Sequence, residues 1–252
     1  MGKRTFAIGD IHGDRVALTR LMSRLPRLTA DDTVVFIGDY VDRGPDPLGV
    51  IRDVQAFCGS SVAKVVTLRG NHEDKWIISR DKPDLAFLVQ VNNGCHTTYR
   101  SIRGVPPLGP NESLPTAELR EMLEVKNWMP LDLHEWMSAL PLWYEDEHAI
   151  YVHAGLDGEG TEWKHPSASR PAPLMWMRDP GFFTGYRGKR LVFGHTPTTE
   201  LPVDHLGPVA KWFDDPGDIW IRGDLIGIDT GAGKGGFLSA IELPKGKVYE
   251  SR

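Results

Sequence analysis

The chain has few cysteines, no excess of basic residues and no long apolar run. Only Cys58 and Cys95 are cysteines among its 252 residues, so neither a disulfide scaffold nor a cysteine metal cluster is expected. The formal net charge is −5, without the basic excess of proteins that bind nucleic acid nonspecifically. No run of about 18 apolar residues occurs, and no secretory leader is recognisable. We therefore expect a cytoplasmic protein that binds neither nucleic acid nor membrane.

Five short runs rich in β-branched and other apolar residues end in glycine beside a polar residue. Three of them lie in the first third of the chain: TFAIGD (5–10), DTVVFIGD (32–39) and KVVTLRGN (64–71). Helical spacing of apolar residues follows the first two, at 16–25 and 48–54. Strands that alternate with helices indicate βαβ units and a parallel sheet. The two later runs, AIYVHAG (149–155) and RLVFGHT (190–196), end in histidine beside glycine.

The remaining segments predict two further features. Residues 81–147 lack this strand ending and have apolar residues at helical spacing before Pro141. They predict a helical insertion that caps one face of a single domain spanning 1–252. Near the carboxyl end, residues 218–231 and 235–250 predict antiparallel strands joined by glycine turns.

Carboxylate, amide and imidazole side chains follow all five predicted strands. Loops at the carboxyl ends of strands in an open α/β sheet meet at one site. We therefore expect six side chains to converge: Asp10, His12, Asp39, Asn71, His153 and His195. Oxygen and imidazole donors of this kind suit manganese, iron, zinc, cobalt or nickel. Six ligands are too many for one catalytic ion but fit two ions that share a carboxylate, for which Asp39 is the natural bridge.

Each of these groups also has a simpler interpretation. A single aspartate after a strand usually caps the next helix, and a single buried histidine is usually a core residue. Five strand ends that all carry metal-type donors favour the metal site. Asp42 and Arg43, in GDYVDRG, form either a surface salt bridge or part of the site. In the second case the carboxylate would orient His72 and the guanidinium would bind phosphate oxygens.

The motifs GDIHG, GDYVDRG, LRGNHE, HAG and GHT, in this order, resemble the phosphoprotein phosphatase branch of the dinuclear metallophosphoesterases. PLMWMRD (173–179) and IDTGAGKGG (228–236) resemble its bacterial and phage serine/threonine phosphatases. The resemblance covers residues 5 to about 240. It implies a calcineurin-like metallophosphoesterase fold of the α/β class, with two mixed β-sheets in a sandwich flanked by helices.

The resemblance also implies a role for each site residue. Asp10, His12 and Asp39 would bind the first metal, and Asp39, Asn71, His153 and His195 the second. His72 and Asp42 match the acid–base pair, and phosphate would be held by Arg43, Arg178, Asn71 and His72. Arg170 and Arg187 compete with Arg178 for this assignment. The cofactors would be two divalent metal ions, with manganese the first choice.

The implied function is a metal-dependent phosphomonoester hydrolase, a serine/threonine protein phosphatase in which a metal-bound hydroxide attacks the phosphorus directly. The substrate would be a phosphorylated protein or a small phosphoester. No regulatory subunit is expected, because the C-terminal tail of eukaryotic members is absent. We expect residues 81–110 and 156–173 to wall the cleft, with four of them near the substrate: Asn92, Asn93, His96 and Arg103.

Three alternatives stay open at this point. A symmetrical diadenosine tetraphosphatase has the same metal site, but it typically lacks the acid that matches Asp42 and has aspartate in place of Glu73. A nucleotide-binding Rossmann module is disfavoured because no G-x-G-x-x-G follows the first strand. A non-catalytic phosphopeptide-binding relative is disfavoured because every ligand and the candidate acid are present.

Overall fold

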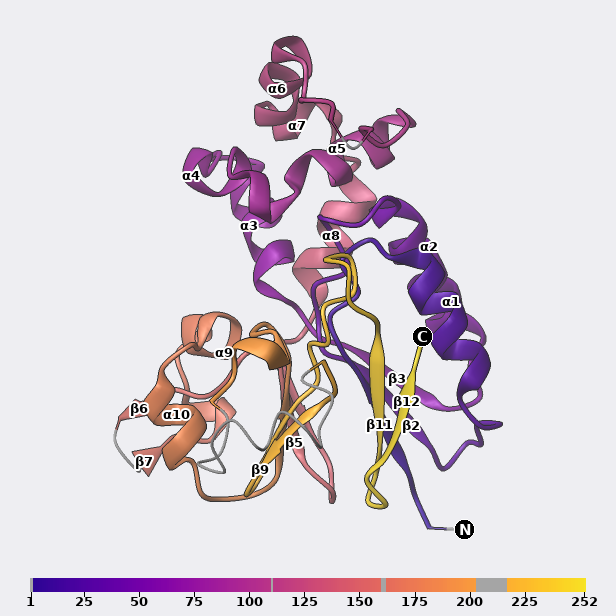
Figure 1. Cartoon of the computed structure of the whole chain (residues 1–252), viewed down its shortest axis with the longest axis vertical. Helices are drawn as coiled ribbons and strands as arrows, with labels where there is room; N and C mark the ends of the chain where they lie inside the picture. Colours follow the sequence, from indigo (N-terminus) through magenta and orange to yellow (C-terminus); the bar gives the residue numbers. More distant parts are fainter. Residues whose placement is uncertain (1, 110, 160–161, 203–216) are drawn as a thin grey trace.

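Two five-stranded mixed sheets form the centre of the molecule in the computed structural model, which describes residues 2–109, 111–159, 162–202 and 217–252 (Figure 1). The first sheet has the order β12-β11-β1-β2-β3. Its strands are β1 (Thr5–Ile8), β2 (Thr33–Phe36), β3 (Lys64–Thr67), β11 (Ser239–Leu243) and β12 (Lys247–Glu250). The parallel pairing of β1, β2 and β3 confirms the prediction from the sequence.

The second sheet has the order β4-β5-β8-β10-β9. Its strands are β4 (Trp143–Glu145), β5 (Ile150–Val152), β8 (Leu191–Phe193), β9 (Trp220–Arg222) and β10 (Leu225–Gly227). β5, β8 and β10 are parallel, and the edge strands β4 and β9 run antiparallel to their neighbours. β6 (Gly158–Glu159) and β7 (Glu162–Trp163) pair with each other, antiparallel, in a separate two-stranded sheet.

Alternation along the strands divides the apolar residues between two layers. Ala7 and Val35 point into the space between the sheets, where they pack with Tyr151 and Val192. The residues of β1 and β2 on either side of Ala7 and Val35 point the other way, into a core that two helices cover. Two helices cover this face: α1 (Arg15–Arg24) and α2 (Pro47–Ser60). The outer face of the second sheet is covered by α9 (Pro171–Trp176) and α10 (Pro180–Gly185).

Further helices lie beyond the carboxyl ends of β1–β3, in the upper part of Figure 1. They are α3 (Asn71–Ser79), α4 (Leu85–Leu88), α5 (Cys95–Arg103), α6 (Thr116–Leu123), α7 (Val125–Trp128) and α8 (Leu131–Ala139). Short 3-10 turns occur at Val91–Asn93, Pro166–Ala168 and Thr198–Glu200. None of the helices in the described part of the chain is both long and apolar enough to cross a membrane.

Two details differ from the sequence-based expectation. β4 falls inside the range 81–147 that was predicted to be helical, because a three-residue edge strand leaves almost no periodic pattern. The two C-terminal hairpins are antiparallel as predicted, but they belong to different sheets. The chain crosses from the second sheet to the first between β10 and β11. That residues 81–147 are an insertion within one catalytic domain stays a prediction.

Candidate active site

The loops after β1 and β2 are bonded to each other and carry the first three predicted donors. The N–H groups of Ile11 and His12 both donate to the carbonyl of Asp39, at 3.1 and 2.8 Å. Neither Asp10 nor Asp39 is the N-cap of the helix that follows its strand. The N-cap of α1 is Asp14, whose carboxylate accepts from Ala17 N, and the N-cap of α2 is Asp46, whose carboxylate accepts from Gly49 N. Neither candidate ligand therefore caps the helix after its strand. Asp39 Oδ1 instead accepts the N–H of His72, at 3.1 Å, in the first turn of a more distant helix, α3.

The backbone of the site adopts conformations that most side chains avoid. In the described ranges, a positive φ outside glycine is confined to His12, Asp39, Asp42, Arg43 and His195. A non-glycine residue in this region costs about 1–3 kcal/mol, so other contacts must hold it there. Glu73 supplies several of them: its carboxylate accepts N–H bonds from Gly70 and from residues 39–41, at 2.9–3.3 Å.

Two groups of donors share one carboxylate. The ligand atoms of His12, Asp39 and His72 lie within 4.8 Å of one another, and so do those of Asp39, His153 and His195. Asn71 joins the second group, because its Oδ1 is 2.9 Å from both His153 Nε2 and His195 Nδ1. Asp39 thus lies between the two groups, as expected of a bridge.

Asp10 completes the converging set. Its Oδ2 is 3.9 Å from His12 Nε2 and accepts the N–H of His195 at 3.0 Å. Its Oδ1 is buried without a hydrogen-bond partner, although a buried carboxylate oxygen normally has one. All six predicted donors are at most 5% exposed. A buried, unpartnered oxygen beside other oxygen and imidazole donors fits a metal ion.

Hydrogen bonds fix the histidine rings. His12 Nδ1 and His153 Nδ1 bond to the carbonyls of Val41 and Ile37, each at 2.9 Å, so Nε2 of both rings faces the site. Burial lowers the pKa of His12, His153 and His195, which keeps these imidazoles in the neutral form that binds metals. Burial would raise the pKa of Asp39, but the surrounding histidines outweigh it and hold that pKa well below its usual value.

His72 and Asp42 form a buried pair beside these donors. His72 Nδ1 is 2.6 Å from Asp42 Oδ2. The other carboxylate oxygen accepts from Trp76 Nε1 at 2.9 Å and from Thr98 Oγ1 at 2.5 Å. This arrangement leaves His72 Nε2 facing the site, 3.9 Å from Asp39 Oδ2. Its position is compatible with a proton donor and also with a metal ligand.

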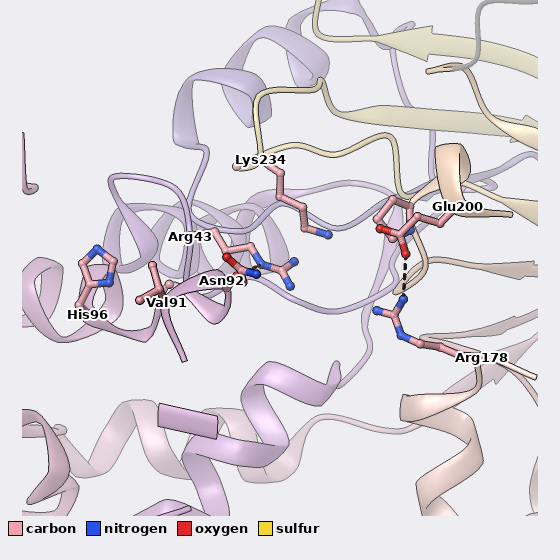
Figure 2. Close-up of a pocket in the computed structure, with 10 residues that line it drawn as sticks. Arg43, Val91, Asn92, His96, Arg178, Glu200 and Lys234 are labelled. Carbon is pink, nitrogen blue, oxygen red and sulfur yellow. Dashed lines mark hydrogen bonds and ion pairs between the residues drawn. The ribbon is translucent and has the colours of Figure 1, made fainter. Parts of the chain in front are cut away.

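A pocket of about 420 Å³ opens above the buried donors. Arg43 and Arg178 line it, together with Asn92, His96 and six other residues, among them Glu200 and Lys234. Arg43 contacts His12 Nε2, and Arg178 bonds through Nε and Nη2 to Nε2 and the carbonyl of His195, each at 3.1 Å. Figure 2 shows both guanidinium groups facing the same space. Residues 156–173, expected as a wall, contribute nothing to the described lining.

The structure separates Arg178 from its two competitors. Arg170 Nη2 is 2.8 Å from the carboxylate of Asp157, and Arg187 donates to the carbonyl of Tyr186 at 2.6 Å. Neither lines the pocket beside the buried donors. Arg178 is therefore the arginine of this region that lies at the site.

Sequence reasoning gave no role to several residues that the structure places here. Trp76, Thr98 and Glu73 hold the loops and the acid–base pair, and nothing in their spacing marks them. Asp229 is different: it is fully buried and follows β10 in the same pattern of apolar strand, acid and glycine as the predicted ligands. Burial together with Asp229 and Asp39 raises the pKa of Asp10. That strand ending could have been recognised.

Comparison with known proteins agrees with the site. Residues 3–225 match the calcineurin-like phosphoesterase family. A symmetrical bis(5′-nucleosyl)-tetraphosphatase of Ralstonia nicotianae is 42% identical, over 94% of this chain and 88% of that protein. One of Paracidovorax citrulli is 26% identical, over 94% and 91%. An asymmetrical bis(5′-nucleosyl)-tetraphosphatase, PrpE, of Anoxybacillus flavithermus is 27% identical, over 94% and 89%.

Solved structures confirm the predicted fold. One that is provisionally named a diadenosine tetraphosphatase superposes with a TM-score of 0.64 at 20% identity, over 98% of this chain and 92% of that one. A serine/threonine phosphatase from Saccharomyces cerevisiae gives 0.56 at 14% identity, over 99% and 82%. The family match over residues 3–225 confirms the expected superfamily. The two symmetrical bis(5′-nucleosyl)-tetraphosphatases carry the name of the alternative that the sequence motifs had placed second.

Proposed function

Because the chain belongs to the calcineurin-like phosphoesterase family, we propose that it hydrolyses bis(5′-nucleosyl) tetraphosphates with symmetrical cleavage. The observation that carries this proposal is the set of relatives named bis(5′-nucleosyl)-tetraphosphatases, which align with nearly the whole chain. A serine/threonine protein phosphatase, the first expectation from the sequence, becomes the second candidate.

The six converging donors would hold the metal ions. Asp10, His12 and Asp39 would bind one, and Asp39, Asn71, His153 and His195 the other. The unpartnered Oδ1 of Asp10 and the neutral imidazoles support this assignment. Two divalent ions would supply positive charge that stabilises phosphoryl oxygens, and they would lower the pKa of water enough to provide hydroxide as the nucleophile near neutral pH. Manganese remains our first choice among the metals that this donor set suits.

Side chains of the pocket would position the phosphoryl group. Arg43 and Arg178 face it from opposite sides, and a guanidinium can bind two phosphate oxygens at once. Asn71 and His72 lie below them and would contact the same group. Since His72 Nδ1 bonds to Asp42, the proton for a leaving oxygen would come from Nε2.

One observation favours the second candidate. The His72–Asp42 pair is buried and is held by bonds from Trp76 and Thr98. A serine or threonine alkoxide is a poor leaving group and needs a proton donor. A nucleoside diphosphate leaves as a stable anion and needs little help. The pair therefore suits a phosphomonoester with an alkoxide leaving group.

Product analysis separates the candidates. Manganese-loaded protein would be assayed with diadenosine tetraphosphate, a phosphoserine peptide and a phosphotyrosine peptide, and kcat/KM compared. We expect diadenosine tetraphosphate to be the best substrate and ADP to be its only nucleotide product. If the products were ATP and AMP in equal amounts, the cleavage would be asymmetrical and not symmetrical. A phosphoserine peptide that is hydrolysed more efficiently than the dinucleotide would establish the second candidate instead.

A further inference from the structure

A third cation lines the pocket beside the two arginines. Lys234 comes from the loop between β10 and β11, whereas Arg43 follows β2 and Arg178 follows α9. In Figure 2 its ammonium group extends into the pocket between Arg43 and Glu200. Glu200 is the one carboxylate among the described residues that line this pocket. Although Arg178 pairs with Glu200 and Lys234 with the buried Asp229, the pocket thus presents three cationic side chains that can donate hydrogen bonds to a ligand.

The loop that carries Lys234 is held against the metal-site loops. Gly233 has φ +71, and a Cβ there would lie only 2.4 Å from the carbonyl oxygen of His12. The N–H groups of Lys234 and Gly236 both donate to the carbonyl of Gly231, at 3.0 and 2.9 Å. Close packing and internal bonds therefore fix where the lysine side chain begins.

The ammonium group of Lys234 pairs with a buried carboxylate and also faces the open pocket. Lys234 Nζ is 3.1 Å from Oδ2 of the buried Asp229, and the lysine side chain is 23% exposed. An ammonium group carries three protons. One of them satisfies Asp229, so the others are available to a ligand in the pocket. The pair with Asp229 also restricts the lysine, which lowers the entropy cost of binding.

We propose that Lys234 binds the phosphate groups next to the one that is attacked, so that the site favours a polyphosphate chain over a single phosphate. This inference rests on the proposed function and names the residue that selects its substrate class. Each added phosphate brings negative charge and oxygen acceptors to which an ammonium group can donate. The two arginines would hold the attacked phosphoryl group, and Lys234 the adjoining part of the chain.

Competition with inorganic phosphates tests the role of Lys234 without a dinucleotide. Hydrolysis of nitrophenyl phosphate would be inhibited with orthophosphate, pyrophosphate and tripolyphosphate at a fixed excess of manganese. We expect the inhibition constant of the wild type to fall as the chain lengthens. In Lys234→Gln, the constant for tripolyphosphate should rise about tenfold more than that for orthophosphate, since one charged hydrogen bond is lost. Lys234→Arg should restore most of the difference.

A matched control removes a lysine beside another buried acid. Lys245 Nζ is 3.6 Å from Glu242, whose side chain is 3% exposed, and it lies at the opposite end of the first sheet from Asp10. Lys245→Gln should keep the wild-type ratio of inhibition constants. If Lys234→Gln raised both constants by the same factor, or neither, the lysine would only neutralise Asp229 and the inference would be wrong. A chain that leaves diadenosine tetraphosphate intact but keeps the Lys234-dependent ratio rejects the proposed function alone.

Discussion

On the floor of the site the polar side chains are held mostly by other loops, whereas on the rim charged side chains reach in from partly exposed positions. The floor consists of Asp10, His12, Asp39, Asp42, Asn71, His72, His153 and His195, all at most 5% exposed. The rim consists of Arg43, Arg178, Glu200 and Lys234. Arg178 and Glu200 pair at 3.4 Å with side chains 48% and 60% exposed.

From this difference we infer that the floor carries out the chemistry and that the rim selects the substrate. A floor side chain cannot turn without breaking bonds to a neighbouring loop, so its geometry is the same for every substrate. Rim side chains are partly exposed, so their charges are partly screened by water, and they face whatever enters the pocket. We therefore expect floor replacements to slow every substrate, with His72 as an exception that depends on the leaving group. Rim replacements should change the affinity for the substrate, and the size of that change should depend on how many phosphates the substrate has.

The largest effect is expected from Asp39→Asn. Wild-type protein should contain close to two transition-metal ions per chain, and Asp39 lies in both donor groups. Its replacement weakens both positions, so activity should fall on the order of a thousandfold on nitrophenyl phosphate and on the dinucleotide alike. Elemental analysis should show the loss of metal. The melting temperature should report a folded protein, because asparagine can still accept the His72 N–H. One ion or none in active wild type would contradict the two-metal assignment.

The floor and the rim also differ in how far the sequence predicts them. The six donors were predictable because each lies just after a short apolar strand and within two residues of a glycine, and the topology brings such strand ends together at one place. The same rule applies to Asp229, which follows β10 but was not among the predicted site residues. Glu73, Trp76 and Thr98 were not predictable from spacing, since their contacts depend on how α3 and α5 pack against the loop after β2.

The rim depends on tertiary placement that one sequence does not specify. Asn92 and His96 do line the pocket as expected, but Asn93 and Arg103 are not among its lining residues. The same holds for the fold: runs of apolar residues predicted the parallel strands, whereas the second sheet followed only from the family resemblance. Short strands such as β4, and a chain that changes sheets between β10 and β11, leave no periodic signal.

His72→Asn is expected to have the next largest effect, and only with a poor leaving group. Hydrolysis of a phosphoserine peptide should fall about a hundredfold or more, because the alkoxide loses its proton donor. Nitrophenyl phosphate and diadenosine tetraphosphate should be affected much less, with metal content retained. Asn71→Ala is the matched comparison on the same helix turn, and it should lose metal and slow all substrates. Equal slowing of every ester together with loss of metal in His72→Asn would make His72 a ligand.

Arg43→Lys should have a moderate effect. Lysine keeps the charge but loses the planar group that binds two oxygens, which we expect to lower kcat/KM about tenfold. Inhibition by orthophosphate should weaken in parallel. The variant tests the rim at the point where it touches the floor, since Arg43 contacts His12. Unchanged kinetics would show that Arg43 does not belong to the phosphate site.

Glu200→Gln should have the smallest effect and the opposite sign. The Arg178–Glu200 pair is exposed, so its loss should change stability by no more than about 0.5 kcal/mol. Removing the carboxylate frees Arg178 and ends its repulsion of an anionic ligand. KM for diadenosine tetraphosphate should therefore fall about two- to threefold, while KM for nitrophenyl phosphate changes less.

The salt dependence of this effect decides whether it comes from the rim. Interactions between partly exposed charges, repulsive as well as attractive, are screened over about 10 Å at 0.1 M salt, so the gain in Glu200→Gln should shrink as ionic strength rises. Glu147→Gln removes the same charge from an exposed position before β5, at the end of that strand away from His153, and should leave KM unchanged. A gain that persists at high salt, or that also appears in the control, would mean that Glu200 does not tune the pocket through its charge. Substrate selection would then have to come from shape, and the separation of floor from rim would lose its electrostatic basis.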